Sequence, residues 1–258
     1  MWSLYLIMPF KKFTPKTSSI RFKVIINKHF LKLKKFKKFF FKKKKNNSGR
    51  NNSGQITVRH KGSGKFNFKR KIDIFREYNC PGNFINYDLD KKHTGFLSLI
   101  KYINGSFSYI LAPNELIFNQ SIGVNFINIG KSIGNACPIG WLKNGVVIYN
   151  LENNPRCGTK YIKSAGTFGK IIHHTKNNVL IKLPSKNLKY FSKYCFASIG
   201  RVSNILHFMS VLGKAGASRL KNIRPTVRGE TMNPIDHPMG GRTRGGKPTK
   251  NPWGKIVK

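Results

Sequence analysis

FLSLIKYINGSFSYIL, residues 96–111, holds two short apolar runs on either side of an Asn-Gly pair. The runs, Phe96–Tyr102 and Phe107–Leu111, have the length and the aromatic and β-branched content of β-strands. Asn104-Gly105 is a strong hairpin signal, because both residues tolerate the positive φ angles of a tight turn. The segment therefore predicts a β-hairpin.

Runs of the same kind extend on both sides of this hairpin, from about residue 55 to about 200. Gly, Asn and Pro separate them, as Lys176-Asn177-Asn178 does between two of the runs. This spacing favours small β-barrels over helices. The number of strands suits two barrels, with a seam near 120–135 in the Gly-rich stretch Ser121–Gly134. The further predicted strands are Gln55–Arg59, Lys71–Arg76, Phe84–Asp88, Val146–Tyr149, Gly169–His174 and Val179–Leu183.

The charge of the chain is its most unusual property. The 258 residues carry 49 Lys and Arg against 8 Asp and Glu, a formal net charge of +41. Such self-repulsion opposes a compact state unless a polyanion neutralises it, and nucleic acid is the obvious polyanion, with an anionic membrane surface second. The apolar content of 39% and the 20 Phe still provide a core, which argues against full disorder.

Residues 1–50 contain many basic residues and no acidic one. Within them Phe36–Lys45 alternates aromatic and cationic blocks, which would suit a basic amphipathic helix or a solvated arm. We favour an RNA-binding arm, in which Lys contacts phosphate and Phe stacks on bases, over a targeting peptide or a membrane-surface helix.

The composition changes again near the end of the chain. Arg201–Leu212 predicts a short helix, and residues 213–258 hold eight Gly, five Pro and few apolar residues. Such a segment cannot bury a core, so we expect it to be extended in the free protein. Residues 213–244 also hold five of the 12 arginines in a Lys-rich chain, which indicates bidentate phosphate binding and base stacking.

Other patterns argue against an enzyme and against a metal site. Gly130-Lys131-Ser132 lacks the earlier glycine that a phosphate loop needs. The adjacent His173 and His174 would point to opposite faces of a strand. The four cysteines are far apart and form no zinc-binding pair, so we expect free thiols. With eight carboxylates in the whole chain, acid–base catalysis has little to work with.

Several strings then point to one family. SGRNNSGQITVRHKGSG (48–64), ILAP (110–113), PIGWLKNGVVIYNLE (138–152), SAGT (164–167) and GKAGASRLKNIRPTVRGETMNPIDHPMGG (213–241) occur in order. They closely resemble large-subunit ribosomal protein two in its bacterial and organellar form. The resemblance runs from about 46 to 258, and the arm before 46 does not match convincingly. RPTVRG followed by MNPIDHPMGG is its most specific part.

The resemblance implies a mainly β protein: an OB-fold barrel, then an SH3-like barrel, with a basic N-terminal arm and an extended Gly/Pro/Arg-rich tail. We place the N-terminal extension at 1–45, the OB-fold RNA-binding domain at 46–125, the SH3-like barrel at 126–200, and the short helix and tail at 201–258. The implied function is that of a structural constituent of the large ribosomal subunit. It binds large-subunit rRNA and supports assembly, subunit association and the region of the peptidyl transferase centre.

The same resemblance implies the site. We expect no catalytic residue, no metal site and no cofactor of its own, with Mg²⁺ in the surrounding rRNA. His237 falls near the peptidyl transferase centre in a supporting role, and Asn233 and Asp236 would fix the turn that presents it. Trp253 would stack on a base or fill a protein pocket. The candidate RNA-binding residues are Arg50, Arg59, His60, Lys61, Lys214, Arg219, Arg224, Arg228, Asn233, Asp236, His237, Gly240, Gly241, Arg242, Arg244, Lys247 and Trp253.

The chain departs from the family pattern at a few positions. Met239 replaces a usual second His, Arg242 and Thr243 replace a Gly and a Glu, and the linker Glu152–Cys157 is unusual. These changes and the bias toward Lys, Asn, Ile and Phe favour a mitochondrial ribosome in the matrix over a plastid or a bacterial cytoplasm. The expected partners are large-subunit rRNA, neighbouring ribosomal proteins and the small subunit at a bridge, with no membrane insertion. The alternative function is a general basic nucleic-acid-compacting or membrane-surface-binding protein.

Overall fold

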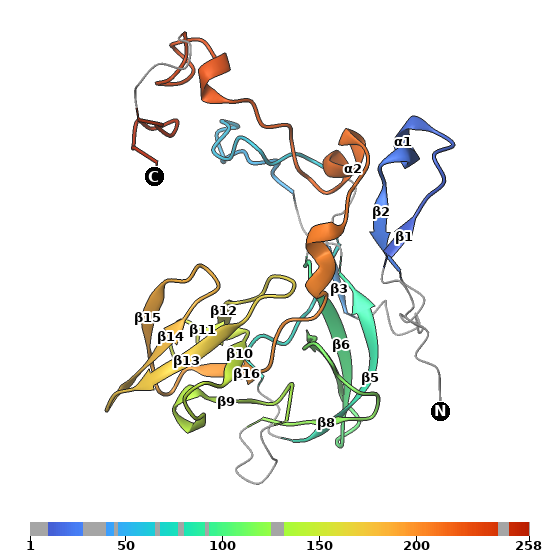
Figure 1. Cartoon of the computed structure of the whole chain (residues 1–258), viewed down its shortest axis with the longest axis vertical. Helices are drawn as coiled ribbons and strands as arrows, with labels where there is room; N and C mark the ends of the chain where they lie inside the picture. Colours follow the sequence, from blue (N-terminus) through green and yellow to red (C-terminus); the bar gives the residue numbers. More distant parts are fainter. Residues whose placement is uncertain are drawn as a thin grey trace. The chain divides into compact units, whose positions relative to one another are not determined.

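The computed structural model describes residues 10–27, 40–43, 46–64, 68–76, 80–90, 93–124, 132–241 and 248–257 (Figure 1). The chain forms two compact units. We call residues 1–45 with 66–217 the barrel unit, and residues 46–65 with 218–258 the tail unit. Each is described by itself. Strands dominate the barrel unit, so the expected mainly β class is confirmed.

The first sheet of the barrel unit is antiparallel and has the order β7-β6-β5-β8. Its strands are β5 (Gly82–Leu89), β6 (Phe96–Tyr102), β7 (Phe107–Leu111) and β8 (Ser121–Ile122). The predicted hairpin is the β6–β7 pair. Its turn is closed by Gly105 N–H to Tyr102 O at 3.0 Å and Tyr102 N–H to Ser106 O at 2.9 Å. Gly105 takes a φ of +80°, which is the reason for a glycine after Asn104.

Strand β6 is buried on both of its faces. Leu97 and Leu99 belong to the large core cluster that includes the second sheet, while Ile100 and Tyr102 belong to a separate cluster with β5 and β8. A strand with a core on each side needs apolar residues at nearly every position. This is why the run reads as continuous rather than alternating.

The second sheet is also antiparallel and has the order β15-β14-β13-β10-β16-β9 (Figure 1). A smaller pair, β11 (Leu151–Glu152) with β12 (Thr159–Tyr161), and the 3-10 turn η2 (Ile139–Trp141) accompany it. Tyr149 donates its hydroxyl to Leu111 O at 3.2 Å, which ties this sheet to β7. Its strands are β9 (Ala136–Pro138), β10 (Val147–Tyr149), β13 (Gly169–His174), β14 (Asn178–Lys182), β15 (Leu188–Ser192) and β16 (Phe196–Ile199).

The buried carboxylate of Glu152 holds the unusual linker that follows it. It accepts backbone N–H groups from Arg156 at 3.3 Å, Gly158 at 3.1 Å and Phe196 at 3.0 Å. Three such donors compensate a buried carboxylate without a cation. The linker is therefore a structural turn.

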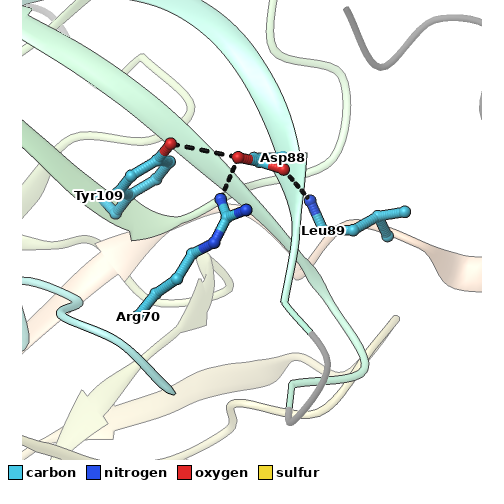
Figure 2. A network of polar contacts seen from close by, with 4 residues as sticks. All are labelled: Arg70, Asp88, Leu89 and Tyr109. Carbon is cyan, nitrogen blue, oxygen red and sulfur yellow. Dashed lines mark hydrogen bonds and ion pairs between the residues drawn. The ribbon is translucent and has the colours of Figure 1, made fainter. Parts of the chain in front are cut away.

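A buried ion pair stabilises the part of the barrel unit that flanks residues 46–65 in the sequence. β3 (Phe41–Lys43) and β4 (Phe68–Arg70) pair with each other on either side of that excursion. Figure 2 shows the buried Arg70 guanidinium paired with Asp88 of β5, whose carboxylate also accepts the Tyr109 hydroxyl at 3.1 Å. Burial, followed by the negative charge of Asp88, raises the pKa of Tyr109 to about 12.

Residues 10–27 of the N-terminal arm form a β-hairpin. It comprises β1 (Phe10–Lys12), α1 (Ser18–Arg21) and β2 (Val24–Ile26), and Val24 bridges to Val211 beyond the second sheet. Ile26 packs against the buried cluster of Phe96 and Ala112. Of Phe36–Lys45, only 40–43 are described, and of these Phe41–Lys43 form the strand β3 and not a helix.

Two predicted strands are wrong. Gln55–Arg59 forms turns, since its backbone binds Gly49 and Asn51 instead of a neighbouring strand. Lys71–Arg76 is interrupted because the Asp73 carboxylate accepts the amides of residues 75 and 76. The helix predicted over 201–212 is limited to the 3-10 turn η3 (Ile205–Met209), and α2 (Ala215–Leu220) and the 3-10 turn η4 (Gly229–Thr231) follow it.

Candidate nucleic-acid interface

The tail unit brings together two basic segments that lie about 160 residues apart in the sequence. Lys61 bridges antiparallel to Ile223. Gly62 N–H donates to Asn222 O at 3.0 Å, and Arg224 N–H donates to His60 O at 2.9 Å. The predicted residues Arg59, His60 and Lys61 thus lie on a strand-like segment beside the one that carries Arg224, and Arg219 lies just before that segment, in the last turn of α2 (Ala215–Leu220).

Two glycines make this pairing possible. A Cβ on Gly64 would lie closer than 3.0 Å to Asn222 Oδ1 and to the carbonyl oxygens of Arg219 and Leu220. A Cβ on Gly62 would press on the Arg224 side chain at 3.0 Å. Sequence reasoning did not single out these glycines or Asn222, although the Gly-Ser-Gly string was the available signal.

The tail unit has almost no interior. Of its described residues only His237 and Gly240 are buried. Arg50, Arg59, Lys61, Arg219 and Arg228 are all exposed. No carboxylate lies in 46–64, and neither of the ion pairs that the structure gives for the described residues falls in this unit. The arrangement offers a cationic surface whose carboxylates are limited to Glu230 and Asp236 among the described residues of this unit, as expected for a surface that binds phosphates.

The loop 229–241 is a compact turn built around His237. Asn233 O accepts the N–H groups of Asp236 at 3.0 Å and His237 at 3.3 Å, and Gly241 N–H donates to Met232 O at 3.0 Å. Asn233 and Asp236 therefore shape this turn through their backbones, while both residues are exposed. Gly240 packs on the carbonyls of residues 232 and 233 so closely that a Cβ would overlap them.

The His237 imidazole has one nitrogen already engaged. Its Nδ1 accepts the Met239 N–H at 3.1 Å, so the neutral ring carries its proton on Nε2. In that form Nε2–H can donate a hydrogen bond to an acceptor but cannot take up a proton. The geometry favours a role in positioning over a role as a general base.

Met239, which replaces the usual second histidine, takes part in this turn. Its Sδ accepts the Lys250 N–H at 3.1 Å and so connects the loop to residues 248–257. Trp253 lies in a short hairpin there and is 80% exposed, so it fills no pocket among the described residues. Lys214 is exposed just before α2. Arg242, Arg244 and Lys247 lie outside the described residues.

The other motifs supply no alternative site. Gly130 and Lys131 lie outside the described residues, and His173 and His174 lie on β13, where neither is buried. Within the described ranges no group of three or more His, Cys, Asp or Glu is placed to hold a metal ion. Among the helices of those ranges, none has the length and apolar character required to cross a membrane.

Comparisons with known proteins cover nearly the whole chain. The family model described as Ribosomal Proteins L2, RNA binding N-terminal domain, matches residues 37–123, and that described as Ribosomal Proteins L2, C-terminal domain, matches residues 132–254. The large ribosomal subunit protein uL2 of Bartonella quintana is 38% identical over 255 residues, covering 97% of this chain and 92% of that protein. The large ribosomal subunit protein uL2m of Reclinomonas americana is 39% identical over 251 residues, covering 95% and 90%.

These alignments correct one expectation. Coverage of 97% includes most of residues 1–45, so the view that the resemblance begins near residue 46 was wrong. The predicted domain boundaries at 45, 125 and 200 stay predictions.

Proposed function

Because the chain belongs to the Ribosomal Proteins L2 family, we propose that it is a structural constituent of the large ribosomal subunit that binds large-subunit rRNA. Membership identifies the region of β5–β8 as OB-like and the region of β9–β16 as SH3-like, which confirms the expected order of barrels. It also places the chain among structural proteins, so the protein is not an independent enzyme.

One structural observation supports this function most strongly. Residues 59–62 pair with 222–224 and form an exposed cationic surface that lacks an apolar core. A surface of this kind gains its stability from phosphate contacts, and counterion release makes its binding sensitive to salt. The barrels add rigid surfaces that dock on folded RNA by shape and phosphate contact.

The finer parts of the proposal concern place and partners. The protein supports assembly, association with the small subunit and the geometry of the peptidyl transferase region, beside neighbouring ribosomal proteins. His237 acts there as an Nε2–H donor that holds RNA geometry. Mg²⁺ belongs to the surrounding rRNA. The uL2m relative and the Lys/Asn/Ile/Phe bias support a mitochondrial ribosome in the matrix, with a plastid or bacterial cytoplasm as the alternatives.

Sedimentation of a native lysate in a density gradient, with and without ribonuclease, tests this proposal. We expect the chain to migrate with the large subunit and to leave that position after ribonuclease treatment. Migration as a free protein, or with DNA or membranes, would contradict it and favour the compacting or membrane-surface alternative. That alternative requires only charge and amphipathicity and predicts no ordered barrels. The two sheets of the barrel unit therefore argue against it.

A further inference from the structure

Two hairpins of the tail unit share one seven-residue pattern. Arg50–Ile56 reads RNNSGQI and Lys250–Ile256 reads KNPWGKI. Each has a cation first, then Asn, two variable residues, Gly, a polar residue and Ile. The first lies within residues 37–123, which one family model matches, and the second begins within residues 132–254, which the other model matches. We call them the first and second finger.

The fingers also share their backbone structure. Arg50 bridges to Ile56, and Lys250 bridges to Ile256, both antiparallel. Asn51 N–H donates to Gln55 O at 3.0 Å, and Asn251 N–H donates to Lys255 O at 2.8 Å. The glycines, Gly54 and Gly254, take φ values of +79° and +82° and accept the strain of the turn.

The asparagine makes each finger independent of a hydrophobic core. Asn51 Oδ1 accepts the Gln55 N–H at 2.9 Å, and Asn251 Oδ1 accepts the Lys255 N–H at 2.8 Å. In the β6–β7 hairpin the position equivalent to these asparagines is Tyr102. Its side chain is buried in the barrel, so packing supports that hairpin. The fingers therefore have a defined shape before any partner binds, which lowers the cost of binding.

One face of each finger is largely exposed. Cross-strand partners lie on the same side of a hairpin, so Arg50 shares a face with Ile56, and Lys250 with Ile256. Arg50 and Lys250 are exposed, and the isoleucines are 54% and 57% exposed. Asn51 with Gln55, and Asn251 with Lys255, point to the opposite face. In both fingers a β-branched side chain is exposed to water beside a cation. This repeated arrangement indicates that the face binds a partner.

We propose that each finger binds the ribose–phosphate backbone of folded RNA, with the cation on a phosphate and the isoleucine against a ribose. The inference rests on the proposed function and adds the surface that carries it out. The charge favours RNA over a protein as the partner, because neither finger contains a carboxylate and the net charge of the chain is +41. One isoleucine per face is also too little apolar surface for a typical protein interface.

Filter binding of the full chain to isolated large-subunit rRNA, over a range of salt concentrations, tests the proposal. Lys250→Gln removes a charge from the proposed RNA face, and Lys255→Gln removes the same charge from the opposite face of the same finger. We expect Lys250→Gln to reduce the slope of log K against log salt by about one and to weaken binding about fivefold at 0.15 M. Arg50→Gln should match it, and Lys255→Gln should change neither value.

The isoleucines give a second readout that charge alone does not affect. Ile56→Ser and Ile256→Ser should each weaken binding at an unchanged salt slope. All these variants keep Asn51, Gly54, Asn251 and Gly254, and the amide NMR signals of both glycines would verify that the fingers persist.

Three results would overturn the inference. Equal effects of Lys250→Gln and Lys255→Gln would show that only overall charge matters. Unchanged binding in all variants would remove RNA as the occupant. Loss of incorporation into the subunit with unchanged affinity for isolated rRNA would assign the faces to a protein. Failure of the proposed function is distinct, since the unaltered chain would then not sediment with the large subunit.

Discussion

The backbone of Gly229 packs directly against the His237 ring. A Cβ on Gly229 would lie closer than 3.0 Å to three atoms of the imidazole ring. The ring cannot move away freely, because its Nδ1 is held by the Met239 N–H. The His237 ring can therefore occupy this position only because residue 229 has no side chain.

Gly229→Ala should displace the His237 ring and break its hydrogen bond with Met239. We expect the ¹⁵N signals of the His237 ring to lose the pattern of an Nε2–H tautomer, and incorporation of the protein into the subunit to fall several-fold. Gly216→Ala is the matched control, since Gly216 lies in α2 with nothing within 4 Å of its Cβ. That change should be neutral or stabilise by up to about 1 kcal/mol, because alanine favours a helix. Unchanged His237 signals in Gly229→Ala would contradict the argument.

Residue types alone indicated only the arginines of this site, which stand out in a Lys-rich chain. The family resemblance pointed to His237 and to the turn residues Asn233 and Asp236. The acceptor role of Nδ1 could not be predicted, because it depends on how residues 233–241 fold back on themselves. The contact between Met239 Sδ and Lys250 was unforeseen for the same reason.

At the scale of elements, Tyr149 connects the two sheets. It lies on β10, is fully buried and donates its hydroxyl to Leu111 O on β7 at 3.2 Å. Burial raises the pKa of Tyr149 from 10.0 to about 12, partly offset by the Arg76 charge. The folded state thus holds this proton at a pH where the unfolded chain releases it.

This pKa difference predicts a loss of stability in alkaline solution. Because the folded pKa is raised, the contribution of Tyr149 is complete below pH 10 and is lost as the pH rises through 12. The free energies of urea unfolding of the full chain and of Tyr149→Phe should therefore approach each other as the pH rises from 9 and cross before pH 12, because the rise in pKa from 10.0 to about 12 corresponds to about 3 kcal/mol. The original chain is more stable at pH 9 by about 1 kcal/mol, the value of one hydrogen bond. Lysine titration affects both proteins equally. A constant difference over this range would contradict the assignment.

Strand prediction succeeded where turn chemistry and burial agreed. β6, β7 and β13 have the predicted bounds, because Gly, Asn or Pro ends each run. β15 was missed, since three of its five residues are exposed and it carries no apolar alternation. The segment 71–76 failed for a local reason, the capture of two amides by Asp73. Local side-chain bonds of this kind compete with a sheet without changing composition.

At the scale of the whole molecule, the two units differ in what stabilises them. The barrel unit has an apolar core that includes Leu97, Ile148 and Ile181, each with no exposed surface. The tail unit buries only His237 and Gly240 among its described residues and depends on backbone hydrogen bonds and asparagine caps. Composition predicted this contrast, but not that residues 46–65 join the tail. That pairing depends on long-range contacts between Lys61 and Ile223, which no local pattern specifies.

Limited proteolysis of the free protein should reveal the same contrast. Basic residues of the tail unit, such as Arg59, Lys61 and Arg228, are exposed on segments without a core, so trypsin should cut there first. A fragment that covers about 80–210 should persist, although it contains many lysines, because its strands open only when the core opens. Addition of large-subunit rRNA should protect the tail sites and leave the core pattern unchanged. Mass spectrometry of the fragments measures both effects. Cleavage at equal rates in β13–β16 and in the tail would contradict this division, because it would mean that the sheets lack an independent core.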